Sequence, residues 1–201
     1  VAEEYPDVRI VALPENIGVA AGRNAGLRLA RGRHLMILDN DTIADPATVY
    51  ALSAYLDRNP DVGLVAPKLL SPGGDVQSSF RPYPGLKAKL TSLLRGRSRS
   101  SLASHIPSGP IEPFYVIGAA QMFTRSVYEA SGGLDEQIFF GPEDADFCMA
   151  VRDAGLKVVY APRYTLVHDW QRATSARPFS KSARTHLKAL IYFYRKHNRW
   201  W

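Results

Sequence analysis

The sequence predicts an α/β fold, with a sheet flanked by helices, and two observations carry this prediction. Strand and helix patterns alternate from the front of the chain to Leu70, which is the order typical of α/β domains. Residues 35–38 form a continuous apolar run, typical of a strand buried on both faces of a parallel sheet. This run ends abruptly at Asp39 and Asp41, and ligands of open α/β sheets bind outside the carboxyl ends of strands.

The front of the chain predicts a right-handed β-α-β unit. Alternating apolar residues predict a strand over residues 8–13, followed by a turn at residues 14–18. Good helix formers then predict a helix over residues 19–31, with Gly32 ending it in the C′ position. The strand at residues 35–38 follows within a few residues and completes the unit.

The next segment begins with a clear helix start. Asp45 is expected to cap a helix whose first residue is Pro46 and which stops before Asn59. A strand is expected over residues 62–70. From residue 71 to residue 113 the pattern dissolves into a basic insertion, which is either a solvated flexible loop or a lid or acceptor-contacting loop whose cations meet phosphate. Five basic residues gather between residues 87 and 99, namely Lys87, Lys89, Arg95, Arg97 and Arg99.

The second half continues the alternation. We expect a strand over residues 114–123, helices over residues 125–131 and 142–154, two short strands at 157–160 and 165–167, and a final helix within residues 179–201. The final helix is interpreted either as a core-packing element or as a basic aromatic surface that rests on an anionic membrane. Together, residues 1–201 are expected to form one domain.

Asp39 and Asp41 are the first candidate site. In an extended backbone their side chains point to the same side, where they repel each other unless a cation lies between them. Mg²⁺ and Mn²⁺ prefer such oxygens and often carry a diphosphate. A strand-to-helix loop with Asp41 as a cap is the structural alternative.

A second set of candidate residues consists of carboxylates at the start of a later helix and a histidine after a later strand. Glu143, Asp144 and Asp146 begin the helix after Pro142, where they either stabilise the helix dipole or place an ionised carboxylate at a cleft. His168 follows a short strand and is either a packed residue or a ligand.

Composition limits the partners. The chain has 201 residues, a net charge of +6 and one cysteine, so it favours acidic partners such as nucleotide sugars, phospholipid surfaces or nucleic acid. A single cysteine fits a reducing compartment, and no apolar run approaches the roughly 18 residues of a membrane span. The basic residues gather in one stretch without a nucleic-acid motif, so we expect no nucleic-acid partner.

Several motifs in order resemble the inverting family 2 glycosyltransferases, which have the GT-A fold, and in particular the rhamnosyltransferase-like enzymes of bacterial polysaccharide assembly. The matching segments are Asn16-Ile17-Gly18 with Ala21-Gly22-Arg23-Asn24, Leu38-Asp39-Asn40-Asp41-Thr42, Gly132-Gly133-Leu134-Asp135, Glu143-Asp144-Ala145-Asp146-Phe147, and His168. The resemblance implies a Rossmann-like mixed sheet and metal-dependent transfer of a sugar from a nucleotide-diphosphate sugar to a glycan or lipid-linked acceptor. It also implies a cytoplasmic protein, peripheral on the inner face of the cell membrane.

The resemblance implies roles for individual residues. Asp39, Asp41 and His168 would hold Mn²⁺ or Mg²⁺, and Asp144 would be the general base. The implied donor-binding residues are Asn16, Arg23, Asn24, Asp39 and Asn40, of which the first three either touch the nucleotide or brace its loop. The implied acceptor-binding residues are Glu143, Asp146, Gly118, Ala119 and Gln121.

The front of the chain departs from the family pattern. Family members begin with strand ends of a Thr-Tyr-Asn type and of an Asp-rich type, and neither is found here. The sequence therefore predicts a GT-A sheet that lacks its first N-terminal β-α elements, with an open edge that favours a homo-oligomer. This departure also supports an alternative function, a truncated, non-catalytic module that binds a sugar nucleotide or a glycan.

Overall fold

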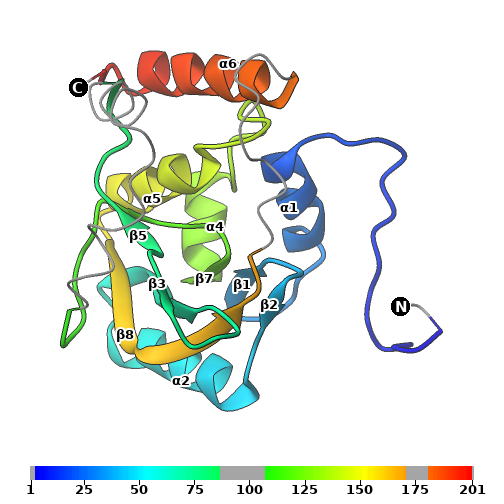
Figure 1. The fold of residues 1–201 in the computed structure, drawn as a ribbon, viewed down its shortest axis with the longest axis vertical. Coiled ribbons are helices and arrows are strands. Elements are labelled where there is room, and N and C mark those ends of the chain that lie inside the picture. The colour runs from blue at the N-terminus through cyan, green and yellow to red at the C-terminus, as the bar shows by residue number, and fades with distance from the viewer. Residues whose placement is uncertain (1–2, 87–106, 171–180, 201) are drawn as a thin grey trace.

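A central sheet separates two layers of helices. The computed structural model describes residues 3–86, 107–170 and 181–200. The helix α2 covers one face of the sheet, whereas α1, α4 and α5 cover the other (Figure 1). The helices are α1 (Val19–Leu27), α2 (Pro46–Arg58), α4 (Arg125–Ser131), α5 (Glu143–Asp153) and α6 (Lys181–Lys196). The strands are β1 (His34–Leu38), β2 (Thr42–Ile43), β3 (Val62–Leu70), β4 (Val76–Gln77), β5 (Phe80–Arg81), β6 (Tyr115–Val116), β7 (Ala120–Thr124) and β8 (Lys157–His168).

The sheet is mixed, with the strand order β1-β7-β3-β8-β2, and β4 pairs with β3 beside this path. The strands β3 and β8 run parallel, with Leu64 opposite Val158. The strand β7 runs antiparallel to both β1 and β3, and β2 runs antiparallel to β8. The α/β class with a mixed sheet flanked by helices is therefore confirmed.

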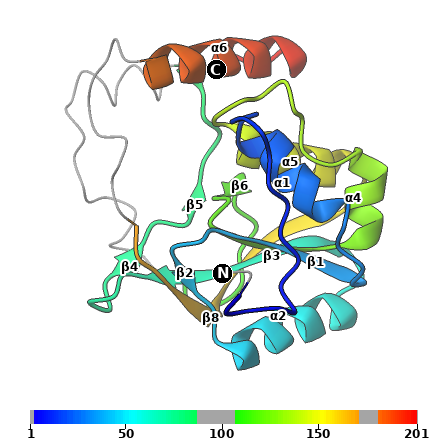
Figure 2. The same ribbon diagram turned by 90° about the vertical axis from the view of Figure 1, so that its right-hand side faces the viewer.

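The first predicted strand is wrong, and so is the β-α-β unit that depended on it. In the part of the chain that the structure describes, residues 8–13 form no strand. Val8 and Ile10 are about half exposed, at 54% and 50%. This segment runs beside the body of the molecule in Figure 1 and passes in front of it in Figure 2. Alternating apolar residues make a strand only where a neighbour pairs with them, and the described chain supplies no neighbour here.

The strand β1 also differs from the expected central parallel strand. It lies at an edge of the sheet, and among the described residues its only partner is the antiparallel β7. Its side chains alternate between buried and partly exposed, and Leu38 is 40% exposed. An apolar run therefore marks a strand correctly here without revealing its direction or its place in the sheet.

Capping residues in the sequence predicted the start of α2 and the end of α4. The Asp45 carboxylate accepts hydrogen bonds from the amides of Ala47 (3.2 Å) and Thr48 (3.3 Å), so α2 begins at Pro46 as predicted. The helix α4 ends at Gly132, whose φ of 72° is left-handed. The helix α1 ends earlier than predicted, at Leu27, so Gly32 does not cap it.

Two strand predictions change in their boundaries. Residues 114–123 divide into β6 and β7, and the two strands predicted between residues 157 and 167 are one strand, β8. The pairing of β8 with β3 moves from Ala161–Pro67 directly to Thr165–Lys68. The intervening residues 162–164 form a bulge, which is the place where the sequence predicted a break.

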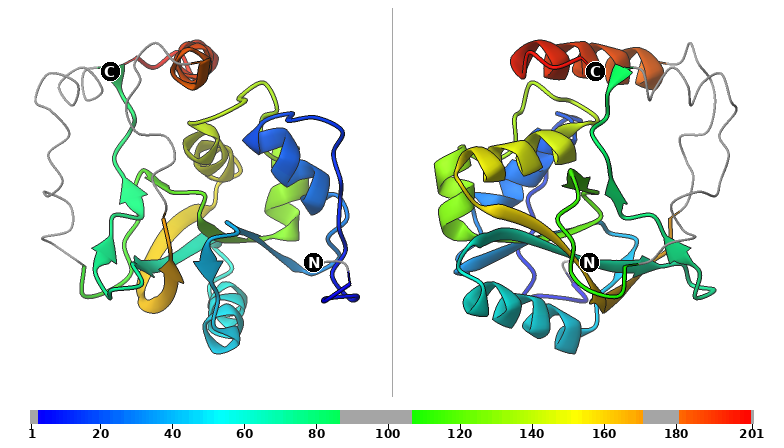
Figure 3. Two further views of the ribbon diagram at one scale, coloured as in Figure 1. Left: turned by 45° about the vertical axis from the view of Figure 1, so that its right-hand side comes forward. Right: turned by 90° about the vertical axis from the view of Figure 1, so that its left-hand side faces the viewer.

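The described part of the insertion contains short strands, and the final helix packs on the core. Residues 71–86 and 107–113 contain β4, β5 and a bridge between Ile111 and Tyr160, whereas the five basic residues between residues 87 and 99 lie outside the described residues. Figure 3 shows α6 above α5, and its Ala189, Leu190, Phe193 and Tyr194 are buried. The core-packing interpretation of α6 is confirmed, and membrane contact stays a prediction. Among the described helices, none combines the length and apolar character of a membrane span.

Candidate functional site

Three predicted metal ligands meet where β1 and β8 end and β2 begins. Asp39 follows β1, Asp41 precedes β2, and His168 is the last residue of β8. Thr42 pairs with His168, and the Asp169 amide donates to the Asp41 carbonyl oxygen at 2.8 Å. One ligand atom from each of Asp39, Asp41 and His168 lies within 4.8 Å of the other two. Backbone pairing therefore brings two carboxylates and an imidazole together from distant parts of the chain.

The environment of Asp41 fits a divalent cation. The Oδ1 atom of Asp41 is buried and has no hydrogen bond within the described residues, although the Nε2 atom of His168 lies 3.3 Å away. A buried carboxylate oxygen without a partner is costly. Carboxylate oxygens suit Mg²⁺ and Mn²⁺, and an imidazole nitrogen favours Mn²⁺, so these residues can hold the implied ion.

Arg23 connects this cluster to the first turn of α5. Its guanidinium donates to Asp39 Oδ1 at 2.8 Å, to Glu143 Oε1 at 3.2 Å and to the Gly118 carbonyl at 3.0 Å. The side chains of Arg23 and Glu143 are 16% and 10% exposed, so their ion pair is largely shielded from water, whereas Asp39 is 38% exposed. A Cβ atom at residue 118 would overlap the guanidinium, which explains the glycine.

Asp144 lies next to Glu143 at the start of α5 and is half-buried. Burial and the negative charge of Glu143 raise the pKa of the Asp144 carboxyl to about 7, although the Ala145 amide and Arg23 act in the opposite direction. The Ala145 amide donates to Asp144 Oδ1 at 2.8 Å. A carboxyl group with this pKa can accept a proton near neutral pH.

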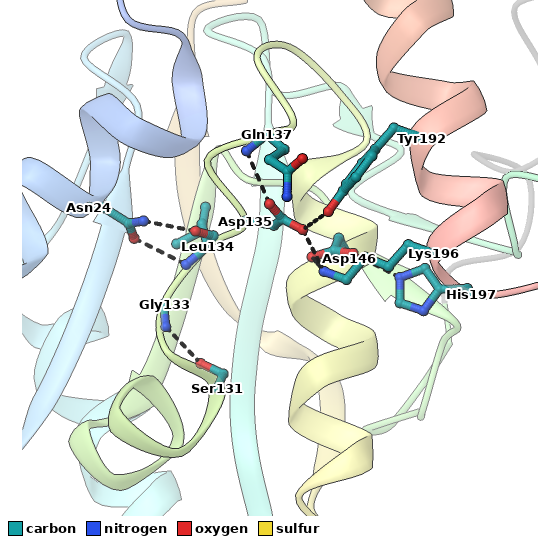
Figure 4. A network of polar contacts seen from close by, with 10 residues as sticks. All are labelled: Asn24, Ser131, Gly133, Leu134, Asp135, Gln137, Asp146, Tyr192, Lys196 and His197. Carbon is teal, nitrogen blue, oxygen red and sulfur yellow. Dashed lines mark hydrogen bonds and ion pairs between the residues drawn. The ribbon is translucent and has the colours of Figure 1, made fainter.

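Three amide side chains that were predicted to bind ligands make hydrogen bonds within the fold, and their ligand-binding roles stay predictions. The buried Asn24 side chain bonds to both the amide and the carbonyl of Leu134, at 3.0 Å and 2.8 Å (Figure 4). Gln121 is 1% exposed and donates to the Val116 carbonyl at 2.8 Å. The Asn16 side chain accepts from the Gly18 amide at 3.0 Å and shapes the turn before α1. These contacts account for the three amides as braces of the fold.

Asp146 belongs to a separate polar cluster that fastens α6 to the body of the molecule (Figure 4). Its carboxylate bonds to Lys196 Nζ at 2.9 Å and His197 Nε2 at 2.7 Å. Lys196 also reaches Asp135 at 2.7 Å, and Tyr192 donates to the same carboxylate at 2.8 Å. Although burial opposes it, hydrogen bonding to Lys196, Gln137 and Tyr192 lowers the pKa of Asp135. These partners of Asp146 are therefore different from those of the Arg23 network.

The remaining predicted residues lie close to the cluster. The Ala119 carbonyl accepts from the Asp39 amide at 3.0 Å, and Asn40 is exposed between the two aspartates. Glu143 is largely engaged, because it binds Arg23 through one oxygen and the Gly141 amide through the other.

Sequence reasoning missed Gln77. The amide of this residue makes two contacts with His168, one to its side chain and one to its backbone. Gln77 lies in the insertion that the sequence predicted as patternless, and no spacing or motif marks it. The bracing role of Arg23 was one of two options open from the sequence, and the structure shows that role.

Solved structures with the same architecture are glycosyltransferases with the GT-A fold. The mannosyltransferase PcManGT from Pyrobaculum calidifontis, solved with GDP-Man and Mn²⁺, superposes with a TM-score of 0.55 at 21% identity, covering 86% of this chain and 43% of that one. GalNAc-T7, solved with UDP, GalNAc and Mn²⁺, superposes with a TM-score of 0.65 at 14% identity, covering 96% and 39%. At these identities the likeness establishes the fold.

The family follows from the sequence. The profile of Glycosyl transferase family 2 matches residues 1–131, and the chain belongs to this family. The pre-mycofactocin glycosyltransferase of Mycobacterium tuberculosis is 28% identical over 163 residues, which are 81% of this chain and 32% of that protein. The dTDP-rhamnosyl transferase RfbF of Shigella flexneri is 25% identical over 166 residues, 80% and 52%. The chain therefore spans only a third to a half of these two relatives.

Proposed function

We propose that this chain carries out metal-dependent, inverting transfer of a sugar from a nucleotide-diphosphate sugar to a hydroxyl group of a glycan or lipid-linked acceptor. The observation that carries the proposal is one connected network. It runs from His168 and Asp41 through Asp39 and Arg23 to the pair Glu143 and Asp144. Such a network has an ion-holding end and a proton-accepting end, which are the two functions that this reaction needs.

The ion-holding end consists of Asp41 and His168, with Asp39 beside them. These residues would hold Mn²⁺ or Mg²⁺, and Asp41 Oδ1 supports this because it has no hydrogen bond within the described residues. When bound, the ion supplies Lewis-acid stabilisation of the negative charge on the departing nucleoside diphosphate. Arg23 holds Asp39 at 2.8 Å, so that this carboxylate keeps its place whether or not a donor is present.

The proton-accepting end is Asp144. In the proposed reaction its carboxylate takes the proton from the acceptor hydroxyl, whose oxygen attacks the anomeric carbon from the face opposite the leaving group. The pKa of about 7 suits this role, because a base is most effective when its pKa lies near the working pH. Glu143 supports the role by keeping a negative charge next to Asp144.

The test is Asp144→Asn in the full-length gene product. The amide cannot accept the proton, so we expect transfer to fall by about 10² to 10⁴-fold, while Mn²⁺-dependent donor binding stays within about threefold. Asp153→Asn is the matched control, because Asp153 is an exposed residue of the same helix. Turnover at the wild-type rate in Asp144→Asn would show that this residue is not the base.

The donor is proposed to be a deoxyhexose or hexose nucleotide, because one relative is named a dTDP-rhamnosyl transferase. A panel of nucleotide sugars with and without Mn²⁺, read by product mass and by shift in melting temperature, identifies it. Binding without product for every donor and acceptor would instead favour the truncated, non-catalytic module. We further propose a cytoplasmic location, contact with the inner face of the membrane and homo-oligomerisation through the β1 edge.

A further inference from the structure

Gln77 is held against His168 by rigid backbone pairing. It is the last residue of β4 and pairs with Leu69 of β3. The turn before β4 is closed by Ser71, whose amide donates to the Asp75 carbonyl at 2.8 Å and whose hydroxyl accepts from the Asp75 amide at 3.0 Å. The position of Gln77 therefore follows from the strand pairing and the turn.

The contacts of Gln77 determine which way its amide points. Its Nε2 atom lies 2.7 Å from the carbonyl oxygen of His168, and a carbonyl oxygen can only accept a hydrogen bond. The nitrogen must therefore face that carbonyl, which leaves Oε1 facing His168 Nδ1 at 2.7 Å. Because an amide oxygen can only accept, Nδ1 of the imidazole must carry a proton.

This proton fixes the state of the other ring nitrogen. In a neutral imidazole with its proton on Nδ1, Nε2 has a lone pair and no hydrogen. That lone pair lies 3.3 Å from Asp41 Oδ1, which is buried and has no hydrogen bond in the described chain. Two acceptors facing each other at this distance leave room for a cation that both can ligate.

We propose that Gln77 is a positioning residue that holds His168 in the Nδ1-protonated tautomer and so makes Nε2 a metal ligand. The inference rests on the proposed function, because it concerns the same ion. It adds that the segment between β3 and β5 controls metal affinity without touching the metal. Partners that orient ligating histidines in this way are typically worth about 10 to 100-fold in metal affinity.

The test compares Mn²⁺ binding by Gln77→Leu and by the wild-type chain, using isothermal titration calorimetry. Leucine has a similar volume and neither donates nor accepts, so we expect affinity to fall by about 10 to 100-fold. The tautomer of His168 is read separately, by ¹⁵N chemical shifts of the metal-free chain at about pH 8, where imidazole is neutral. Gln137→Leu is the matched control, because Gln137 is exposed and lies outside the metal cluster.

A second variant separates tautomer control from simple bracing of β4 against β8. In Gln77→Glu the carboxylate still accepts from Nδ1, but it cannot donate to the His168 carbonyl. Tautomer control predicts that Gln77→Glu keeps the Nδ1-protonated signature and binds Mn²⁺ within about threefold of wild type or more tightly. Bracing predicts that Gln77→Glu and Gln77→Leu lose affinity equally.

The outcomes separate this proposal from the proposed function. It is overturned if wild-type His168 carries its proton on Nε2, if the wild-type chain binds no Mn²⁺, or if Gln77→Leu binds Mn²⁺ as wild type does. It is also overturned if Gln77→Glu is as weak as Gln77→Leu. If Asp144→Asn keeps full turnover while Gln77 controls Mn²⁺ affinity, the proposed base fails and the role of Gln77 stands.

Discussion

The raised pKa of Asp144 predicts that removing its charge stabilises the fold while it removes activity. Asn has nearly the same shape as Asp, and its oxygen can still accept from the Ala145 amide, which lies 2.8 Å from Asp144 Oδ1. The variant Asp144→Asn therefore changes little except the charge. At pH 8 the wild-type carboxyl is ionised next to Glu143, and the amide relieves both the burial cost and this repulsion.

The magnitude follows from the pKa. A rise from 3.8 to about 7 corresponds to about 4 kcal/mol of unfavourable free energy for the ionised folded state. Asp144 is only half-buried, so water relaxes a large part of this cost. We expect Asp144→Asn to raise the free energy of unfolding by about 1–2 kcal/mol at pH 8.

The pH dependence gives the prediction its direction. A carboxyl whose pKa is higher in the folded state binds a proton more tightly there, so its contribution to stability is fully present below the unfolded pKa near 4. That contribution is lost as the pH rises from about 4 through about 7, and it stays lost above. The advantage of Asp144→Asn should therefore be largest above pH 7 and should shrink steadily toward about pH 4.

Urea unfolding followed by circular dichroism between about pH 5 and pH 8 measures this difference. Asp153→Asn, on the exposed end of the same helix, should change the unfolding free energy by less than about 0.5 kcal/mol with little pH dependence. A destabilising effect of Asp144→Asn at pH 8, or a gain that does not vary with pH, would refute the reasoning.

Three further substitutions test other parts of the molecule. His168→Ala should abolish the rise in melting temperature that Mn²⁺ produces, and an unchanged rise in a thermal shift assay would contradict the ion site. Lys196→Met should lower the free energy of unfolding by about 1–3 kcal/mol, because buried Asp146 loses its partner at 2.9 Å; urea unfolding measures this, and no loss would show that the cluster is not stabilising. Gly118→Ala should displace the Arg23 side chain. We expect it to lower the free energy of unfolding by about 1–3 kcal/mol in urea unfolding and to slow sugar transfer in a donor-turnover assay. Wild-type values in both measurements would show that the guanidinium can move freely.

The elements predicted correctly are those whose signals are local. Asp45 and Pro46 mark the start of α2, and Gly132 marks the end of α4. Such signals are local because capping and helix-ending residues act on the backbone next to them. Strand pairing is not local. The sequence could not show that β1 pairs antiparallel with β7, or that residues 8–13 have no partner in the described chain, since both depend on which segments meet in space.

The residues of the candidate site also differ in how clearly the sequence marks them. The strand end marked Asp39 and Asp41 directly, whereas His168 and Asp144 stayed open between a structural and a functional role until the family resemblance favoured the functional one. Asn24 and Asp146 lie within matching motifs, yet their partners Leu134 and Lys196 show that they brace the fold. From the sequence alone, a buried amide or carboxylate that binds a ligand cannot be distinguished from one that bonds to another part of the chain. Only the contacts separate the two.

The network has more carboxylates than cations, and its carboxylates differ in what offsets their negative charge. It contains four carboxylates, those of Asp39, Asp41, Glu143 and Asp144, and one guanidinium among the described residues, that of Arg23. Arg23 neutralises Asp39 and Glu143, and a proton held near neutral pH relieves Asp144. Within the described part of the chain, Asp41 has neither a guanidinium partner nor a hydrogen bond to its buried Oδ1 atom, so in the proposed function it is the carboxylate left for a metal ion. A nucleoside diphosphate would bring further negative charge to this edge of the sheet, and only a cation held there makes its approach favourable.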